Sequence, residues 1–307
     1  MTLHRQAQEL LDSFASATGD GPPPERSVEE MRSLSGGFRQ MQGDAAVIGS
    51  TRVEKIPVSG GFVEATVYDP VGDPNGLVVY FHGGGFVLGA PRDFEVLYHA
   101  LVAQSQVRLV AIDYRLAPEH PFPTGVDDSY AGLLWSAEHL ADGLPIIVAG
   151  DSSGGTFAAV AARRARDHDG PALAAQILVY PVTDHDFSRA SYDEHGDSGL
   201  LVGKSDMEWY WAQYASDPAV RDGEDASPLR AASFEGLPPT FVLVDEYDPV
   251  RDEAKAFADR LIAAKVPTVV DYVADQMHGY FTMANMMASA DESIARVAAY
   301  IRSVVNP

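Results

Sequence analysis

Residues 145–166 read PIIVAGDSSGGTFAAVAARRAR, an apolar run followed by serines between glycines and then by an alanine-rich stretch. The apolar run predicts a strand, and the alanine-rich stretch predicts a helix. A strand that turns directly into a helix places the residue between them in a strained turn, which closes without clashes only beside small residues. We therefore expect the hydroxyl of Ser152 to project alone above a sheet.

The rest of the chain alternates between strand and helix patterns. We expect strands at residues 62–68, 77–81, 108–112, 145–149, 175–180, 240–244 and 268–273, and helices at residues 93–104, 124–140, 251–264 and 290–304. Nearly continuous apolar strands separated by helices are typical of a parallel sheet that is covered on both faces. The last strand is expected at a sheet edge, where unpaired backbone groups can pair with a second copy of the chain. A symmetric homodimer is therefore predicted, although the acidic net charge opposes it.

Two helical stretches precede the first strand. Residues 1–19 have apolar side chains at helical spacing with charges between them, a pattern of an amphipathic helix and not of a signal peptide. A second helix is expected from Ser27 to about Gln42, because Ser27 and Glu30 have the spacing of a capping box.

A second interruption of the alternation lies at residues 183–225. A polar loop is expected at residues 184–198, followed by a helix that Ser205 opens with Glu208 as its capping partner. This helix carries Met207 and an aromatic cluster of Trp209, Tyr210, Trp211 and Tyr214. The cluster either packs in a core or lines a pocket beneath a lid, and the two interpretations are compatible.

The composition of the 307-residue chain excludes several classes of chemistry. The chain has no cysteine, so neither disulfides nor a thiol nucleophile are available. Its 44 acidic and 22 basic residues give a net charge of −22, which makes nucleic acid an unfavourable partner. The acidic excess indicates a well-solvated surface, with salt adaptation as a further interpretation. No apolar run is long enough to span a membrane, and a cytoplasmic location is expected.

A nucleophilic serine needs a base to remove its proton and an acid to orient that base. His278 follows the last expected strand, and no other histidine does. The strand at residues 240–244 leads into the sequence DEYDPVRDE, so the acid remains open among Asp245, Glu246, Asp248 and Asp252.

The segment at residues 81–86, FHGGGF, follows another strand. Attack of a serine on a carbonyl creates an oxyanion, and backbone N–H groups of a glycine-rich turn can approach it closely. The segment lacks the spacing of the phosphate-binding glycine motifs. We assign the oxyanion donors to the amides of Gly83, Gly84 and Ser153.

Two further clusters are interpreted as structural. Asp113, Tyr114, Arg115 and Glu119 are expected to form a network of ion pairs and hydrogen bonds beneath the glycine turn. Residues 184–186, DHD, are expected in a solvated loop, because three adjacent residues do not readily converge on one metal ion.

Four segments together resemble the bacterial hormone-sensitive-lipase family of esterases. They are residues 82–85 (HGGG), 114–120 (YRLAPEH), 150–155 (GDSSGG) and 248–253 (DPVRDE). The resemblance implies an α/β-hydrolase fold, with core segments at residues 46–182 and 226–307 and a helical cap from residues 1–45 and 183–225. It implies hydrolysis of short-chain acyl esters without a cofactor or a metal, with Ser152, Asp248 and His278 as the triad.

The family pattern also assigns roles to residues near the triad. It selects Asp248 as the acid, and Asp252 and Glu253 are then expected to cap the following helix. Four aromatic residues in or facing the cap are expected to bind substrate: Phe86, Trp209, Trp211 and Tyr214. The chain departs from the family at Ser153, where alanine is usual.

Other functions on the same framework stay open from the sequence. An amidase or a dehydratase could use the same triad. Plant gibberellin receptors resemble this family but are binding proteins that lack the catalytic histidine, so His278 favours an enzyme.

Overall fold

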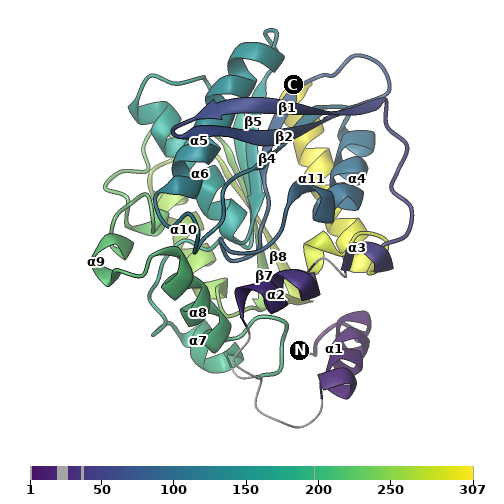
Figure 1. Cartoon of the computed structure of the whole chain (residues 1–307), viewed down its shortest axis with the longest axis vertical. Helices are drawn as coiled ribbons and strands as arrows, with labels where there is room; N and C mark the ends of the chain where they lie inside the picture. The colour runs from purple at the N-terminus through teal and green to yellow at the C-terminus, as the bar shows by residue number, and fades with distance from the viewer. Residues whose placement is uncertain (1, 19–26, 36–37, 197, 307) are drawn as a thin grey trace.

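A computed structural model describes residues 2–18, 27–35, 38–196 and 198–306. Its centre is an eight-stranded sheet of order β1-β2-β4-β3-β5-β6-β7-β8 (Figure 1). The strands are β1 Ser50–Val58, β2 Gly61–Asp69, β3 Leu77–Phe81, β4 Arg108–Asp113, β5 Ile146–Asp151, β6 Ala175–Val179, β7 Thr240–Tyr247 and β8 Thr268–Met277. The hairpin of β1 and β2 is antiparallel and joins β4 in antiparallel register, whereas all pairs from β4 to β8 are parallel. The predicted α/β fold with a mostly parallel sheet is confirmed.

The central strands are buried on both faces, because helices cover each face of the sheet. Every residue of β3, β5 and β6 is buried. One face packs against α4 (Glu95–Ser105) and α11 (Ala288–Val305), and the other packs against α5 (Thr124–Leu140), α6 (Ser153–Asp167) and α10 (Arg251–Ala263) (Figure 1). This arrangement explains why these strands read as continuous apolar runs and not as an alternating pattern.

The N-terminal helices lie at the end of the molecule that holds the carboxyl ends of the parallel strands (Figure 1). Helix α1 spans Arg5–Thr18, and the backbone N–H of His4 donates to the carbonyl of Asp275 at 2.7 Å. The second predicted helix is observed as α2 (Val28–Ser35) and a single turn, α3 (Phe38–Met41); residues 36 and 37 between them lie outside the described residues. The capping box is confirmed, since Ser27 N donates to Glu30 Oε2 at 2.7 Å and Glu30 N donates to Ser27 Oγ at 3.2 Å.

The segment at residues 183–225, here called the insertion, follows β6, and its described part contains three short helices. They are α7 (Ala190–His195), α8 (Lys204–Tyr214) and α9 (Pro218–Arg221). The loop prediction for residues 184–198 therefore missed α7. The predicted cap of α8 was also wrong, because the helix begins after Gly203, whose N–H donates to Asp206 Oδ2 at 2.8 Å. Glycine is accepted at the N-cap position, and the serine pattern two residues later concealed it.

Arginine–carboxylate pairs fasten the insertion to the core. Arg164 of α6 donates to Asp225 Oδ2 at 2.7 Å. Asp184 at the other end of the insertion is buried and accepts from Arg189 at 2.6 Å and from Arg230 at 2.7 Å. The expectation that residues 184–186 form a solvated loop was therefore wrong for Asp184, because two guanidinium groups compensate the burial of its charge.

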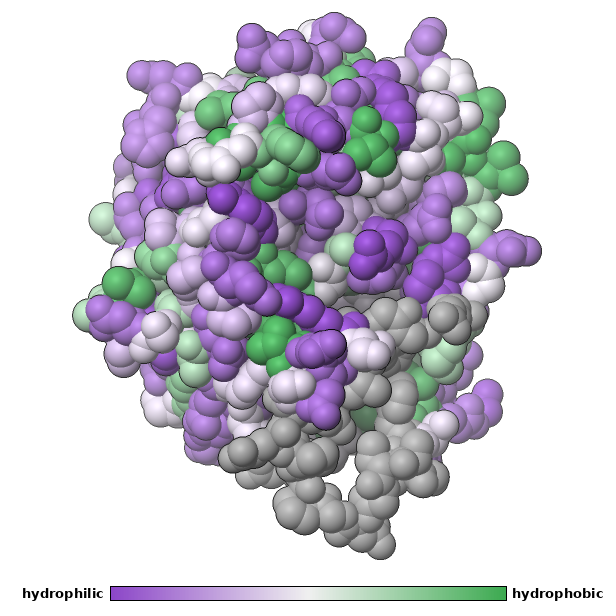
Figure 2. All heavy atoms as spheres, viewed as in Figure 1, coloured by the Kyte–Doolittle hydropathy of each residue, from purple (hydrophilic) through white to green (hydrophobic). Residues whose placement is uncertain are grey.

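The face shown in Figure 2 is mostly hydrophilic, with scattered apolar side chains. Among the described residues, no helix is long and apolar enough to cross a membrane.

Candidate active site

Ser152 lies in the predicted turn between β5 and α6. Its φ of 53° and ψ of −122° are unusual for a residue with a side chain. A Cβ atom at Gly150 would overlap the carbonyl oxygen of Gly154, and one at Gly154 would overlap the carbonyl oxygen of Phe81. Glycine is therefore required at both positions, and the turn presents the Ser152 hydroxyl at the carboxyl end of the sheet.

Three loops at this end of the sheet bring Ser152, His278 and Asp248 together. His278 directly follows β8, and its Nε2 lies 2.8 Å from Ser152 Oγ. Its Nδ1 lies 2.7 Å from Oδ2 of Asp248, which directly follows β7. The N–H of Val250 donates to the second oxygen of Asp248 at 2.8 Å and fixes the carboxylate. All three side chains are buried, with exposed fractions of 8% for Ser152, 5% for His278 and 0% for Asp248.

The other acidic residues near Asp248 face different surroundings. Asp245 is fully buried, and its two carboxyl oxygens have no hydrogen-bond partner among the described residues. Asp252 accepts from Ser191 N at 3.0 Å, and Glu253 accepts from Thr183 N at 2.8 Å. The prediction that Asp252 and Glu253 cap α10 was therefore wrong. The two carboxyl groups instead hold the insertion against this helix. Sequence alone could not distinguish these roles, because the insertion returns to α10 only in the folded chain.

The glycine turn at residues 82–89, here called the glycine loop, lies beside Ser152. The N–H of Gly83 donates to Asp151 Oδ1 at 3.1 Å, so this donor is occupied and its assignment to the oxyanion was wrong. Among the described residues, the N–H groups of Gly84, Gly85 and Ser153 have no acceptor. The candidate oxyanion donors in the loop are therefore the N–H groups of Gly84 and Gly85, one residue later than predicted.

The carboxyl group of Asp151 explains why the N–H of Gly83 is not available to an oxyanion. Its carboxyl group is buried beneath the loop and also accepts from the hydroxyl of Tyr80 at 3.0 Å. Burial raises the pKa of Asp151 to about 6, against the opposing effect of the bonds from Tyr80 and Gly83. The two donors compensate the buried carboxylate, and they fix the first glycine of the loop to the strand that carries Ser152.

The predicted structural network beneath the glycine loop uses partners from other segments. Arg115 forms a two-pronged pair with Asp128, with a closest distance of 2.7 Å, and Glu119 pairs with Arg32 of α2. The hydroxyl of Tyr114 donates to the carbonyl of His82 at 2.7 Å and supports the loop directly.

Comparisons with known proteins agree with this geometry. Residues 78–282 match the family described as having an alpha/beta hydrolase fold. The chain is 36% identical to Carboxylesterase NlhH of Mycobacterium tuberculosis, covering 97% of this chain and 94% of that one. The chain belongs to the hormone-sensitive-lipase family of α/β-hydrolase esterases.

Two further relatives extend the comparison. The chain is 32% identical to an ethyl acetate hydrolase of Pseudomonas putida, covering 78% of this chain and 77% of that one. The crystal structure of a thermostable esterase from Pseudomonas putida ECU1011 superposes with a TM-score of 0.94 at 30% identity, covering 100% of this chain and 98% of that one. The protein is thus a carboxylic-ester hydrolase.

The four aromatic residues expected to bind substrate do not share one environment in this esterase. Phe86 and Tyr214 are stacked with ring centroids 3.8 Å apart, and Trp211 lies 5.7 Å from both. These three side chains are at most 2% exposed, whereas Trp209 is half-buried. The first three form the packed base of the insertion, and Trp209 has the most freedom to face a substrate.

Sequence reasoning placed Tyr210 in the aromatic cluster but gave it no role at the site. A Cβ atom at Gly85 would overlap the ring of Tyr210, so this ring lies directly on a glycine of the glycine loop. The sequence shows only that several large rings share this helix. The folded position of α8 shows that the ring of Tyr210 contacts Gly85.

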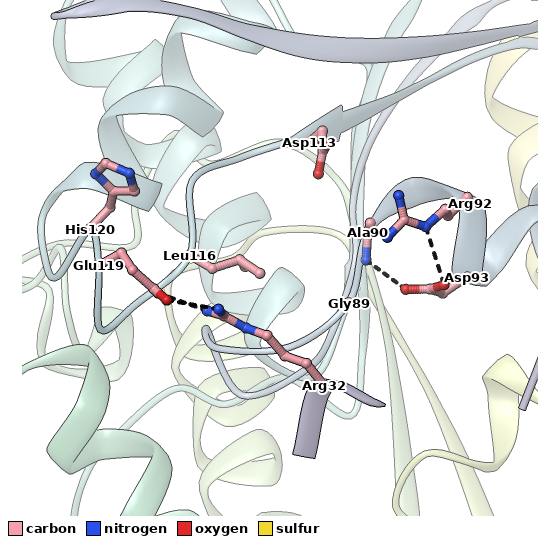
Figure 3. Close-up of a pocket in the computed structure, with 9 residues that line it drawn as sticks. All are labelled: Arg32, Gly89, Ala90, Arg92, Asp93, Asp113, Leu116, Glu119 and His120. Atoms are coloured by element: carbon pink, nitrogen blue, oxygen red, sulfur yellow. Dashed lines mark hydrogen bonds and ion pairs between the residues drawn. The ribbon is translucent and has the colours of Figure 1, made fainter. Parts of the chain in front are cut away.

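A cavity of about 440 Å³ lies on the outer side of the glycine loop (Figure 3). Its lining includes Arg32, Gly89, Asp113 and Glu119, but not Ser152. Among the described residues, no group of three or more histidine, aspartate or glutamate side chains could hold a metal ion.

Proposed function

We propose that the esterase acts through an acyl-enzyme formed on Ser152. The observation that carries this proposal is the continuous chain of short hydrogen bonds from Ser152 through His278 to Asp248. In the first half-reaction, Ser152 Oγ attacks the ester carbonyl while its proton passes to His278 Nε2. Collapse of the tetrahedral intermediate breaks the bond to the alcohol, which leaves with the proton from His278.

The second half-reaction regenerates the enzyme. A water molecule attacks the acyl-enzyme and gives its proton to His278, and the carboxylic acid leaves as Ser152 recovers the proton. Asp248 orients the imidazole and stabilises its charged form in both halves. In this proposal the amides of Gly84, Gly85 and Ser153 hold the oxyanion, because they lie beside Ser152 and have no other acceptor.

We further propose that short acyl chains, about C2 to C6, are preferred. Bulky rings from the insertion, with Trp209 foremost, would shorten the space beside Ser152. The proposed cap of residues 1–45 and 183–225 would then select the substrate, and the core of residues 46–182 and 226–307 would perform the chemistry. The name of the ethyl acetate hydrolase relative, which describes a two-carbon acyl ester, supports the same preference.

The test is a turnover series of p-nitrophenyl esters from C2 to C16, measured beside the matching p-nitroanilides. We expect kcat/KM to be highest between C2 and C6, and we expect the anilides to react far more slowly. An optimum at C8 or longer would refute the short-chain proposal. Faster cleavage of the anilides would favour an amidase.

A further inference from the structure

The glycine loop is fastened on its outer side by one arginine of the N-terminal segment. Arg32 lies on α2, and its Nε donates to the carbonyl of Val87 at 2.9 Å. Its Nη2 donates to the carbonyl of Ala117 at 3.0 Å, and both Nη atoms lie 2.8 Å from the carboxylate of Glu119. One rigid guanidinium thus joins α2, the glycine loop and residues 116–119.

The two carbonyl groups that Arg32 binds belong to Val87, in the glycine loop, and to Ala117, which is hydrogen-bonded to that loop. The N–H groups of Val87 and Leu88 donate to the carbonyl of Gly84 at 3.1 and 2.8 Å. The N–H of Ala117 donates to the carbonyl of Phe86 at 3.0 Å. A displacement of Val87 would therefore reach the Gly84–Gly85 peptide unit, which carries the N–H of Gly85.

The backbone of this turn has positive φ values, which glycine adopts freely but which Phe86, with its side chain, does not favour. Gly84, Gly85 and Phe86 all have positive φ values, of 121°, 59° and 68°. Such a conformation persists where the surroundings impose it. Asp151 restrains the loop at Gly83, the Tyr210 and Tyr214 rings restrain it at Gly85 and Phe86, and Arg32 restrains its far end.

The ion pair with Glu119 holds Arg32 in place beside the cavity that both residues line. Figure 3 shows Arg32 reaching from α2 toward Glu119 across the lower margin of the cavity. The hydrogen bonds from Arg32 lower the pKa of Glu119 to about 2, so the pair stays charged throughout the working range of an esterase.

We propose that Arg32 is a positioning residue that holds the glycine loop in its oxyanion-binding conformation. The inference rests on the proposed function, since it assumes that the loop amides bind the oxyanion. The N-terminal segment then contributes to the rate of the chemical step as well as to access of substrate. Arg32 itself does not touch the reacting atoms.

A thionoester substrate separates this role from a general loss of stability. Replacing the carbonyl oxygen by sulfur places a larger, more weakly hydrogen-bonding atom in the oxyanion site, so a well-formed site strongly prefers the oxygen ester. A misaligned site loses that preference. A variant that is merely less folded loses both activities in equal proportion, and the ratio of the two rates stays constant.

The experiment compares Arg32→Met with Arg302→Met in the full-length chain. Arg302 is the matched control, because it also donates to a backbone carbonyl, that of Gln104, but far from the glycine loop. Each variant is assayed with p-nitrophenyl acetate and with its thionoester, and its melting temperature is measured. Arg32→Lys keeps the positive charge but lacks the planar set of guanidinium donors. It is the second variant if Arg32→Met does not fold.

For Arg32→Met we expect kcat on the oxygen ester to fall about tenfold with KM nearly unchanged, and the oxygen-to-thiono rate ratio to fall about fivefold. Arg32→Lys should show a smaller fall in the ratio, and Arg302→Met none. A wild-type ratio in both Arg32 variants, or an equal fall in Arg302→Met, would overturn the positioning role. A wild-type protein without esterase activity would instead overturn the proposed function.

Discussion

The core and the insertion are held by different kinds of interaction. The loops after β5, β7 and β8 align Ser152, Asp248 and His278 through directed hydrogen bonds of 2.7 to 2.8 Å. The insertion is held by stacked rings and by arginine–carboxylate pairs, such as Phe86 on Tyr214 and Arg164 with Asp225. In the proposed function, the chemistry, which tolerates little displacement, is placed at strand ends, whereas the proposed substrate-facing surface depends on packing that can change without loss of the triad.

The largest effect is expected at the nucleophile. Ser152→Ala should lower kcat by a factor on the order of 10⁶ with an unchanged melting temperature, because the triad acts as a unit. Ser153→Ala is the matched control and should retain most activity, since only the backbone N–H of Ser153 is assigned a role. Greater loss in Ser153→Ala than in Ser152→Ala would show that the assigned nucleophile is wrong. Steady-state turnover and thermal melting measure both properties.

Replacing Asp248 and replacing Asp245, the two aspartates near the end of β7, should have very different effects on kcat. Asp248→Asn should lower kcat by roughly 10⁴-fold, because an amide no longer fixes the tautomer of His278. Asp245→Asn should keep kcat within a fewfold of wild type, because no described group bonds to that carboxyl. Similar losses in the two variants would mean that Asp245 also belongs to the catalytic machinery.

Asp245 should instead control the pH dependence of stability. In the unfolded chain an aspartate ionises near pH 4, whereas burial, with a smaller contribution from Asp248, raises the pKa of folded Asp245 well above its ordinary value. Between these two pKa values the unfolded state has lost a proton that the native state retains. Each pH unit in that window therefore lowers the unfolding free energy by about 1.4 kcal/mol, and no such loss arises below the unfolded pKa.

Asp245→Asn removes this loss. Relative to wild type, the variant should become progressively more stable in urea unfolding as the pH rises above the ordinary aspartate pKa. The exposed Asp259 on α10 supplies the control, Asp259→Asn. A constant stability difference between Asp245→Asn and wild type across this range would contradict the predicted neutral carboxyl.

A smaller effect is expected at the rim of the insertion. Trp209→Ala should raise the ratio of kcat/KM for C8 over C4 esters by about fivefold, because removal of the ring lengthens the acyl space. Tyr214→Ala, which removes a ring stacked in the base, should mainly lower the melting temperature. An unchanged chain-length profile for Trp209→Ala with reduced stability would assign that ring to packing as well.

The smallest effect concerns the sheet edge. The structure confirms that β8 is an edge strand, with Val269, Val270 and Tyr272 exposed by 47%, 42% and 42%. Pairing of this edge with a second copy remains a prediction, and light scattering across a salt series tests it. A dimer mass that persists or grows with salt is expected, because salt screens the repulsion between subunits of charge −22. A monomer mass at every salt concentration would contradict edge pairing. If a dimer is found, Val270→Pro should dissociate it by removing a backbone donor.

Local patterns determined most of the fold. Strand β3 and helix α5 have the predicted bounds, and the glycines around Ser152 predicted its strained turn. These features depend on side-chain periodicity and on backbone conformations that only glycine permits, and both are properties of neighbouring residues. The order of the motifs likewise placed His278 and Asp248 after the correct strands.

Contacts between distant segments were decided only in the tertiary structure. The sequence could not show that the N–H of Gly83 donates to the carboxyl of Asp151, and so Gly83 was predicted as an oxyanion donor although its N–H is already occupied. Asp252 and Glu253 read as helix caps, but the folded insertion supplies them with other donors. A side chain chooses among donors by distance and burial, and for residues far apart in the chain these quantities exist only after folding.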